Sequence, residues 1–163
     1  MILYLIRHAF AGEPGDPRWP DDSLRPLTKD GRKRFAKVVR RLADSGEFAP
    51  RRIATSPYVR CLQTADVTSE AFDDPPEVTP LDALAPGGDI EQIIAWTREQ
   101  DVDAVAWVGH APDIEDQTAA LLGLANGHMR FAKGAIAALT FSGGVELGQG
   151  ELRWLVTAKL LGK

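Results

Sequence analysis

Three short runs that have the character of buried strands constrain the fold more than any other feature of this sequence. They span residues 2–6, 52–55 and 104–108, and each is followed by charged or polar residues. Runs this short are more typical of strands than of helices. The stretches between them carry helical patterns, the clearest of which places four apolar residues on one helix face: Phe35, Val38, Val39 and Leu42. Strands that alternate with helices predict an α/β fold, a three-layer α/β/α sandwich around a mainly parallel sheet.

The expected helices begin at residues that suit a first helical turn. Thr28 can cap one helix, and Asp89 can cap another. Pro57 and Pro112 fit first-turn positions of two further helices, because the missing proline N–H leaves no bond unmade there. The helix that opens at Pro57 is expected to run to about residue 72.

The C-terminal part has a different pattern. Residues 135–141 and 152–160 are expected to be strands, and apolar and polar side chains alternate in the second. The glycine-rich stretch between them, residues 142–150, suits the loop of an antiparallel hairpin. We therefore expect the sheet to end in a C-terminal antiparallel hairpin whose last strand is an edge strand.

Length and composition indicate a single domain over residues 1–163. Hydrophobic residues make up 44% of the chain and charged residues 26%, as in an ordinary globular protein. The net charge of −4 argues against binding of nucleic acid through bulk positive charge. The single cysteine, Cys61, allows no intrachain disulfide and fits a reducing compartment. The apolar start, residues 1–6, is too short to span a membrane, so we expect a cytoplasmic protein without membrane attachment.

Charged and polar side chains follow each of the three expected strands. Arg7 and His8 follow the first strand, Ser56 and Arg60 the second, and His110 the third. Ligands of parallel sheets gather at the carboxyl ends of the strands, so these side chains are expected to converge on one crevice. Positive groups packed together repel, and the arginine fork donates two parallel hydrogen bonds to a phosphate. A phosphate group is therefore the expected occupant.

Two histidines in such a crevice predict phosphoryl transfer. An imidazole among arginines is held in its neutral form, which is a nucleophile near neutral pH. The second imidazole and the guanidiniums would stabilise the charge of the transferred group. The sequence has no His-Glu-x-x-His motif and no cysteine next to these histidines, so it does not predict a metal site. We expect catalysis without a metal or another cofactor.

Three blocks of the sequence, each at the end of an expected strand, carry a family resemblance. Residues 5–9 resemble the Arg-His-Gly signature of the histidine phosphatase (phosphoglycerate-mutase-like) superfamily, with Ala9 in place of the glycine. Residues 55–65 and 108–110 resemble its second and third blocks. The resemblance covers nearly the whole chain, and it is loosest over residues 11–24. It implies a phosphatase that forms a phosphohistidine intermediate.

Two further segments narrow the resemblance to the SixA-type phosphohistidine phosphatases. Residues 25–28 lie ahead of the first helix, and residues 84–89 follow the second block, as in those proteins. The resemblance implies that the partner is a phosphorylated protein, such as a histidine-containing phosphotransfer domain.

The resemblance also implies roles for individual residues. A phosphate pocket would be formed by four residues, with His8 as the covalent nucleophile: Arg7, His8, Arg60 and His110. Arg25 would be a further phosphate or substrate contact. Ser56 would either contact the pocket or only cap the following helix.

One position departs from the pattern of the larger members of the superfamily. Those proteins carry a glutamate, a general acid, where this sequence has Ala83. The adjacent Asp82 is the candidate general acid that the sequence leaves open. An alkoxide leaving group needs a proton from such an acid, whereas a phosphorylated imidazole has a labile P–N bond and can take its proton from water. The departure therefore favours phosphohistidine over phosphate esters, and it argues against a mutase.

Three alternatives stay open at this stage. The chain could hydrolyse small phosphate monoesters, with Asp82 as the acid, or it could be a phosphate-binding module without turnover. A metallohydrolase would need metal ligands that the motifs do not supply. His128, the third histidine, lies in an expected loop and is interpreted as a surface residue.

Overall fold

The structure, a computed structural model, describes residues 1–125 and 129–161. The strands of these residues form one sheet in the order β3-β2-β4-β1-β5-β6. Their bounds are β1 Ile2–Arg7, β2 Arg52–Thr55, β3 Glu77–Pro80, β4 Ala104–Gly109, β5 Ile136–Thr140 and β6 Glu151–Val156.

The sheet has a parallel part and an antiparallel part. Strand β4 lies between β1 and β2 and is parallel to both, and β3 continues the parallel part beyond β2. Strand β5 is antiparallel to β1 on one side and to β6 on the other. The expected α/β fold with a C-terminal antiparallel hairpin is confirmed, and β6 is the edge strand.

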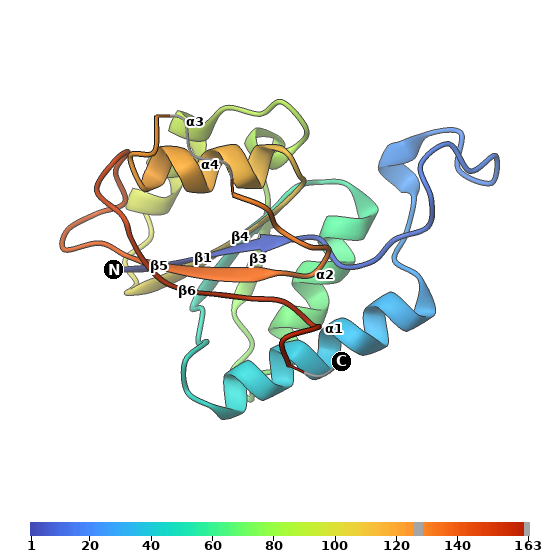
Figure 1. Cartoon of the computed structure of the whole chain (residues 1–163), viewed down its shortest axis with the longest axis horizontal. Helices are drawn as coiled ribbons and strands as arrows, with labels where there is room; N and C mark the ends of the chain where they lie inside the picture. Colours follow the sequence, from blue (N-terminus) through green and yellow to red (C-terminus); the bar gives the residue numbers. More distant parts are fainter. Residues whose placement is uncertain (126–128, 162–163) are drawn as a thin grey trace.

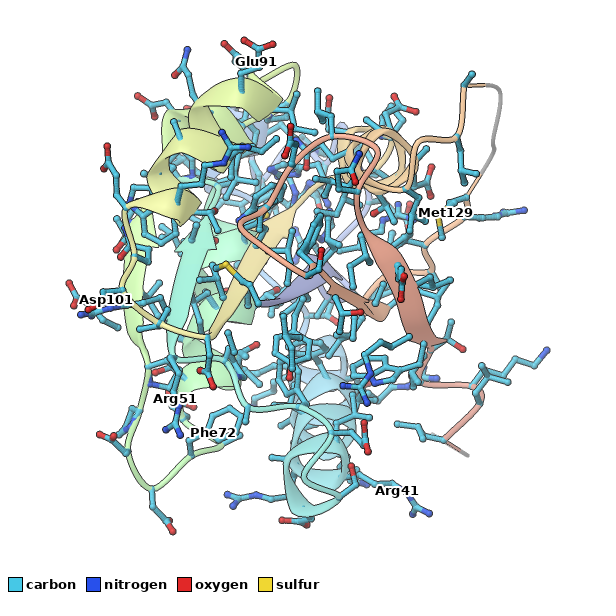
Figure 2. The ribbon with its side chains drawn as sticks, turned by 90° about the vertical axis from the view of Figure 1, so that its left-hand side faces the viewer. Arg41, Arg51, Phe72, Glu91, Asp101 and Met129 are labelled. Atoms are coloured by element: carbon cyan, nitrogen blue, oxygen red, sulfur yellow. The ribbon has the colours of Figure 1, made fainter. Side chains whose placement is uncertain are left out.

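The helices of the described residues cover both faces of the sheet. Helices α3 and α4 lie on one face and α1 and α2 on the other (Figure 1). A view turned by 90° shows the sheet between these layers, with Glu91 on α3 at one extreme and Arg41 on α1 at the other (Figure 2). Their bounds are α1 Lys29–Asp44, α2 Val59–Ser69, α3 Ile90–Arg98 and α4 Asp113–Leu121.

Strand β1 shows why its sequence is apolar without interruption. Tyr4 and Ile6 point into the core that α1 and α2 cover, whereas Leu3 and Leu5 point into the core under α3 and α4. Successive side chains of a strand face opposite sides of its sheet, so a strand with helices on both faces needs apolar residues at every position. The first polar side chains can appear only where the strand leaves the two cores.

Helix starts follow the sequence expectation at two positions and differ from it at the two prolines. Helix α4 begins at Asp113, so Pro112 precedes its first turn. Thr28 accepts a hydrogen bond from the Gly31 N–H at 3.0 Å, and Asp89 caps α3 in the same way. Helix α2, however, begins at Val59 rather than at Pro57, because Tyr58 keeps an extended backbone. Ser56 lies beside the carboxyl end of β4, where its N–H donates to the Val108 carbonyl. Strand β6 ends at Val156, short of the expected residue 160, and α2 ends at Ser69 rather than near residue 72.

The sequence prediction about membranes concerned the first six residues. In the structure these residues form most of a buried strand of the sheet. None of the helices in residues 1–125 and 129–161 has the length and apolar character needed to cross a membrane.

Candidate active site

Three neighbouring strands bring the chemistry-bearing residues to one edge of the sheet. His110 directly follows the central strand β4, and His8 and Ser56 directly follow its neighbours β1 and β2. The His8 N–H donates to the Gly109 carbonyl at 3.0 Å, and the Ser56 N–H donates to the Val108 carbonyl at 2.9 Å. These main-chain bonds extend the sheet just beyond the strands. They fix the spacing of the two imidazoles, whose ring centres lie 5.3 Å apart.

His8 presents one nitrogen to the protein and leaves the other for chemistry. Its Nδ1 lies 2.8 Å from the carbonyl oxygen of Ala9. A carbonyl can only accept, so Nδ1 carries the proton and Nε2 carries the lone pair. The pKa of His8 is lowered to about 3, mainly by burial; the hydrogen bond to the Ala9 carbonyl opposes this shift, and the charges of His110, Arg60 and Arg7 add to it. His8 is therefore neutral near pH 7, as a nitrogen nucleophile must be.

His110 is held by side chains. Its Nδ1 lies 3.3 Å from Arg60 Nη2, and its Nε2 lies 2.8 Å from Ser56 Oγ. Because a guanidinium can only donate, Nδ1 accepts and Nε2 carries the proton that Ser56 Oγ accepts. Burial lowers the pKa of His110 to about 4, with the charge of Arg60 as the next cause. Ser56 thus contacts the pocket, and it also accepts from the Tyr58 N–H at 3.3 Å.

The two pocket arginines each keep an unpaired donor. Arg7 donates from Nη1 to the Phe131 carbonyl at 2.6 Å, and Arg60 donates from Nη1 to the Asp22 carbonyl at 2.7 Å. The Nε atoms of both arginines are buried and have no hydrogen-bond partner among the described residues. An unpaired buried donor is costly, and it indicates a group that is bound during function. Two such donors beside two imidazoles can hold a tetrahedral anion.

Arg25 reaches this cluster through Asp22. Its Nε donates to Asp22 Oδ1 at 2.7 Å, and its Nη1 donates to the Gly12 carbonyl. Asp22 Oδ2 lies 3.1 Å from Arg60 Nη2, so one carboxylate joins the two arginines. The hydrogen bond from Arg25 is the main cause that holds the pKa of Asp22 below its usual range. The predicted direct contact between Arg25 and phosphate stays a prediction.

Sequence reasoning did not identify Asp22 or the carbonyl of Phe131. Asp22 lies three residues before Arg25, which is the spacing of an ion pair within a helical turn, and that signal could have pointed to it. The Phe131 carbonyl carries no side-chain signature, so no residue pattern could have identified it. Tyr58 was also missed, although its ring packs edge-on against His110 at 5.0 Å between centres.

The remaining predicted positions lie apart from this cluster or outside the described residues. Asp82 is exposed on the short 3-10 helix Asp82–Leu84, and no described residue forms a side-chain hydrogen bond or ion pair with it. Its role as a general acid stays a prediction. His128 lies outside the described residues. Within residues 1–125 and 129–161, no group of three or more His, Cys, Asp or Glu side chains is arranged to hold a metal ion.

Comparisons with known proteins agree with this geometry. The sequence profile of the histidine phosphatase superfamily (branch 1) matches residues 3–123. Phosphohistidine phosphatase SixA of Escherichia coli K12 is 26% identical over 157 residues, which cover 94% of this chain and 92% of SixA.

Solved structures agree as well. The structure of the protein histidine phosphatase SixA complexed with tungstate matches with a TM-score of 0.82 and 26% identity over 99% of both chains. A phosphoserine phosphatase mutant from Entamoeba histolytica, 15% identical over 98% of both chains, has the same fold with a TM-score of 0.67. A profile match over most of the chain, with the matched blocks meeting at one edge of the sheet, assigns the protein: it belongs to the histidine phosphatase superfamily.

Proposed function

We propose that this protein removes phosphate from phosphohistidine on another protein, without a metal, through a phosphohistidine intermediate on His8. The observation that carries the proposal is the state of His8. Its Nδ1 is committed to the Ala9 carbonyl, which leaves the lone pair of Nε2 for chemistry. Arg7 and Arg60, whose charges act on this ring, each keep a buried Nε without a partner among the described residues. A neutral, oriented imidazole next to two anion-binding donors is the arrangement that phosphoryl transfer to nitrogen requires.

In the first step, Nε2 of His8 attacks the phosphorus atom and the bond from phosphorus to the substrate imidazole breaks. The leaving nitrogen takes a proton from water, and the hydroxide that remains takes up the proton that the phosphate loses after its release. Arg7 and Arg60 donate hydrogen bonds to the phosphoryl oxygens. His110 donates its Nε2–H to the same group; in the empty site that proton is accepted by Ser56 Oγ. Phosphorylation gives the His8 ring a positive charge. The Nδ1–H bond to the Ala9 carbonyl then becomes a charge-assisted bond and stabilises the intermediate.

In the second step, water attacks the phosphorus atom of the intermediate. The P–Nε2 bond breaks, inorganic phosphate leaves, and His8 returns to its neutral form with the proton still on Nδ1. The burial that lowers the pKa of His8 favours this return, because the neutral ring is the stable form of the empty site. The same arginines serve both steps, since both pass through a phosphoryl group with charge on its outer oxygens.

The substrate class follows from the leaving group. Ala83 stands where the larger superfamily members carry a glutamate, and the exposed Asp82 forms no hydrogen bond or ion pair with either imidazole among the described residues. A positioned acid contributes about 10²–10⁴-fold when the leaving group is an alkoxide. An imidazole leaving group has much less need of it. The similarity to SixA, which is named a phosphohistidine phosphatase, supports the same class.

The test compares a phosphohistidine peptide with a panel of phosphate monoesters, in the presence of EDTA, for wild type and His8→Ala. Fast turnover of phosphohistidine, slow turnover of esters and an inactive, folded His8→Ala variant would support the proposal. Ester turnover equal to or faster than phosphohistidine turnover would instead assign a small-molecule phosphatase. Phosphate binding without any turnover would assign a binding module, and activity that EDTA abolishes would point to a metallohydrolase.

A further inference from the structure

The loop between β1 and α1 inserts a carboxylate into the arginine cluster of the pocket. Asp22 lies on the short 3-10 helix Asp22–Leu24, and its two carboxylate oxygens contact different arginines. Oδ1 accepts from Arg25 Nε at 2.7 Å, and Oδ2 lies 3.1 Å from Arg60 Nη2. Arg25 and Arg60 are buried, whereas about half of the Asp22 side chain is exposed. A carboxylate beside a site for an anion needs an explanation, because its charge repels the ligand.

The contacts of Arg60 supply that explanation. The main-chain carbonyl of Asp22 accepts a hydrogen bond from Nη1 at 2.7 Å, and its carboxylate forms an ion pair with Nη2. Nη1 and Nη2 form the end of the guanidinium fork, whereas Nε and Nη2 form its side. Asp22 therefore holds the end of the fork from two directions. On the side, Nη2 also lies 3.3 Å from His110 Nδ1, and Nε is buried without a partner among the described residues.

We propose that Asp22 is a positioning residue that clamps the end of the Arg60 guanidinium, so that the side edge with Nε faces the phosphoryl group. This inference rests on the proposed function, since it assigns Arg60 to the phosphate. Arg25 completes the clamp: it holds Asp22 Oδ1 and ties the loop to the Gly12 carbonyl. The carboxylate also offsets the repulsion between the two guanidiniums, which allows both to be buried without a ligand.

The proposal predicts that loss of the Asp22 charge weakens phosphate binding, whereas simple electrostatics predicts that it strengthens phosphate binding. Removal of a negative charge next to an anion site should strengthen phosphate binding if Asp22 only competes for Arg60. If Asp22 positions Arg60, Asp22→Asn should weaken binding of inorganic phosphate about tenfold, which is the scale of one hydrogen bond to a charged group. Isothermal titration with inorganic phosphate measures this change directly.

The adjacent carboxylate offers a matched control. Asp21 accepts from the N–H and the hydroxyl of Ser23, and no hydrogen bond or ion pair among the described residues joins it to either arginine. Asp21→Asn removes the same charge from the same loop and should change phosphate affinity by less than about twofold. Thermal unfolding of both variants checks that they are folded. If Asp22→Asn does not fold, Asp22→Glu carries the test, and a lower phosphate affinity than that of wild type is expected.

A second measurement separates positioning from general structural support. In an Arg60→Lys background, the ammonium has no fork for Asp22 to clamp, so Asp22→Asn should then weaken phosphate binding by less than about twofold. Unchanged or tighter phosphate binding in Asp22→Asn, or an equal loss with and without Arg60, would overturn the role of Asp22. A wild-type protein that neither binds phosphate nor hydrolyses phosphohistidine would overturn the proposed function itself, and the inference with it.

Discussion

The two histidines of the pocket lie close together but are held in different ways. His8 is held by the main chain: its Nδ1 is bonded to the carbonyl of the very next residue. His110 is held by the side chains of Arg60 and Ser56, which lie 50 and 54 positions away in the sequence. A point mutation can remove a side-chain partner, but it cannot remove a carbonyl. The difference implies that the orientation of His8 tolerates substitutions around it, whereas that of His110 does not.

The difference matches the tasks that we propose for the two rings. The nucleophile must keep Nδ1 protonated throughout the cycle so that Nε2 is the atom that bonds phosphorus, and a main-chain carbonyl enforces this whatever the charge of the pocket. The second ring must respond to the phosphoryl group, so partners that can rearrange suit it better. Four predictions test this division, beginning with the largest expected effect.

Replacement of the nucleophile should have the largest effect. His8→Asn removes Nε2 and with it the covalent intermediate, so turnover of phosphohistidine should fall at least about 10³-fold. Binding of inorganic phosphate should persist, because Arg7 and Arg60 keep their donors. Steady-state rates and phosphate titration measure the two quantities. Residual activity within tenfold of wild type would show that another group attacks phosphorus.

Replacement of the second histidine should slow the reaction without removing the intermediate. His110→Ala should lower kcat by roughly 10²–10³-fold, which is the usual effect of losing one charge-stabilising donor. A radiolabelled phosphoryl group should still be trapped on His8 when the reaction is quenched with alkali, which preserves phosphohistidine. If no label is trapped, His110 would take part in forming the bond and the division between the two rings would not hold.

Stability should depend on pH through both rings. The folded protein lowers the pKa of His8 to about 3 and that of His110 to about 4, whereas an unfolded histidine titrates near 6.5. The unfolded chain therefore binds more protons below that value, so the stability is fully present above about pH 6.5 and falls as pH decreases towards the folded pKa values.

Chemical denaturation at several pH values between 5 and 7 measures this dependence. Wild type should lose stability as the pH falls, by at most about 1.4 kcal/mol per pH unit for each histidine. A variant with both His8→Asn and His110→Asn should show a clearly flatter dependence. An equally steep loss in the double variant would mean that other groups cause it.

Loss of the serine hydroxyl should have the smallest effect. Ser56→Ala removes the acceptor of the His110 Nε2 proton, and one hydrogen bond between neutral groups contributes about 1 kcal/mol, or roughly fivefold in kcat. Ser69→Ala is the matched control, because the Ser69 hydroxyl donates to the Pro76 carbonyl at the far end of α2. Equal rates for both variants would show that Ser56 does not orient His110.

The sequence was sufficient for the features that follow from strand order. Uninterrupted apolar runs predicted buried strands, and the rule that ligands gather at the carboxyl ends of parallel strands predicted that His8, Ser56 and His110 would meet. The clamp by Asp22 could not be predicted in the same way. It depends on the path of the loop over residues 8–28, which no periodic pattern describes. The partner of Arg7, the Phe131 carbonyl, was hidden for another reason, since every residue has such an oxygen.

The position of β5 beside β1 has a consequence for the order in which the site can form. The Gly134 N–H lies within bonding distance of the carbonyls of both Arg7 and His8, and Phe131 holds Arg7, so the end of β1 is fixed by residues that follow the matched motif blocks. During synthesis, Arg7 and His8 leave the ribosome before residues 131–140. The pocket is complete only after residues 131–140 have been synthesised, so a nascent chain contains its nucleophile before the site can be active.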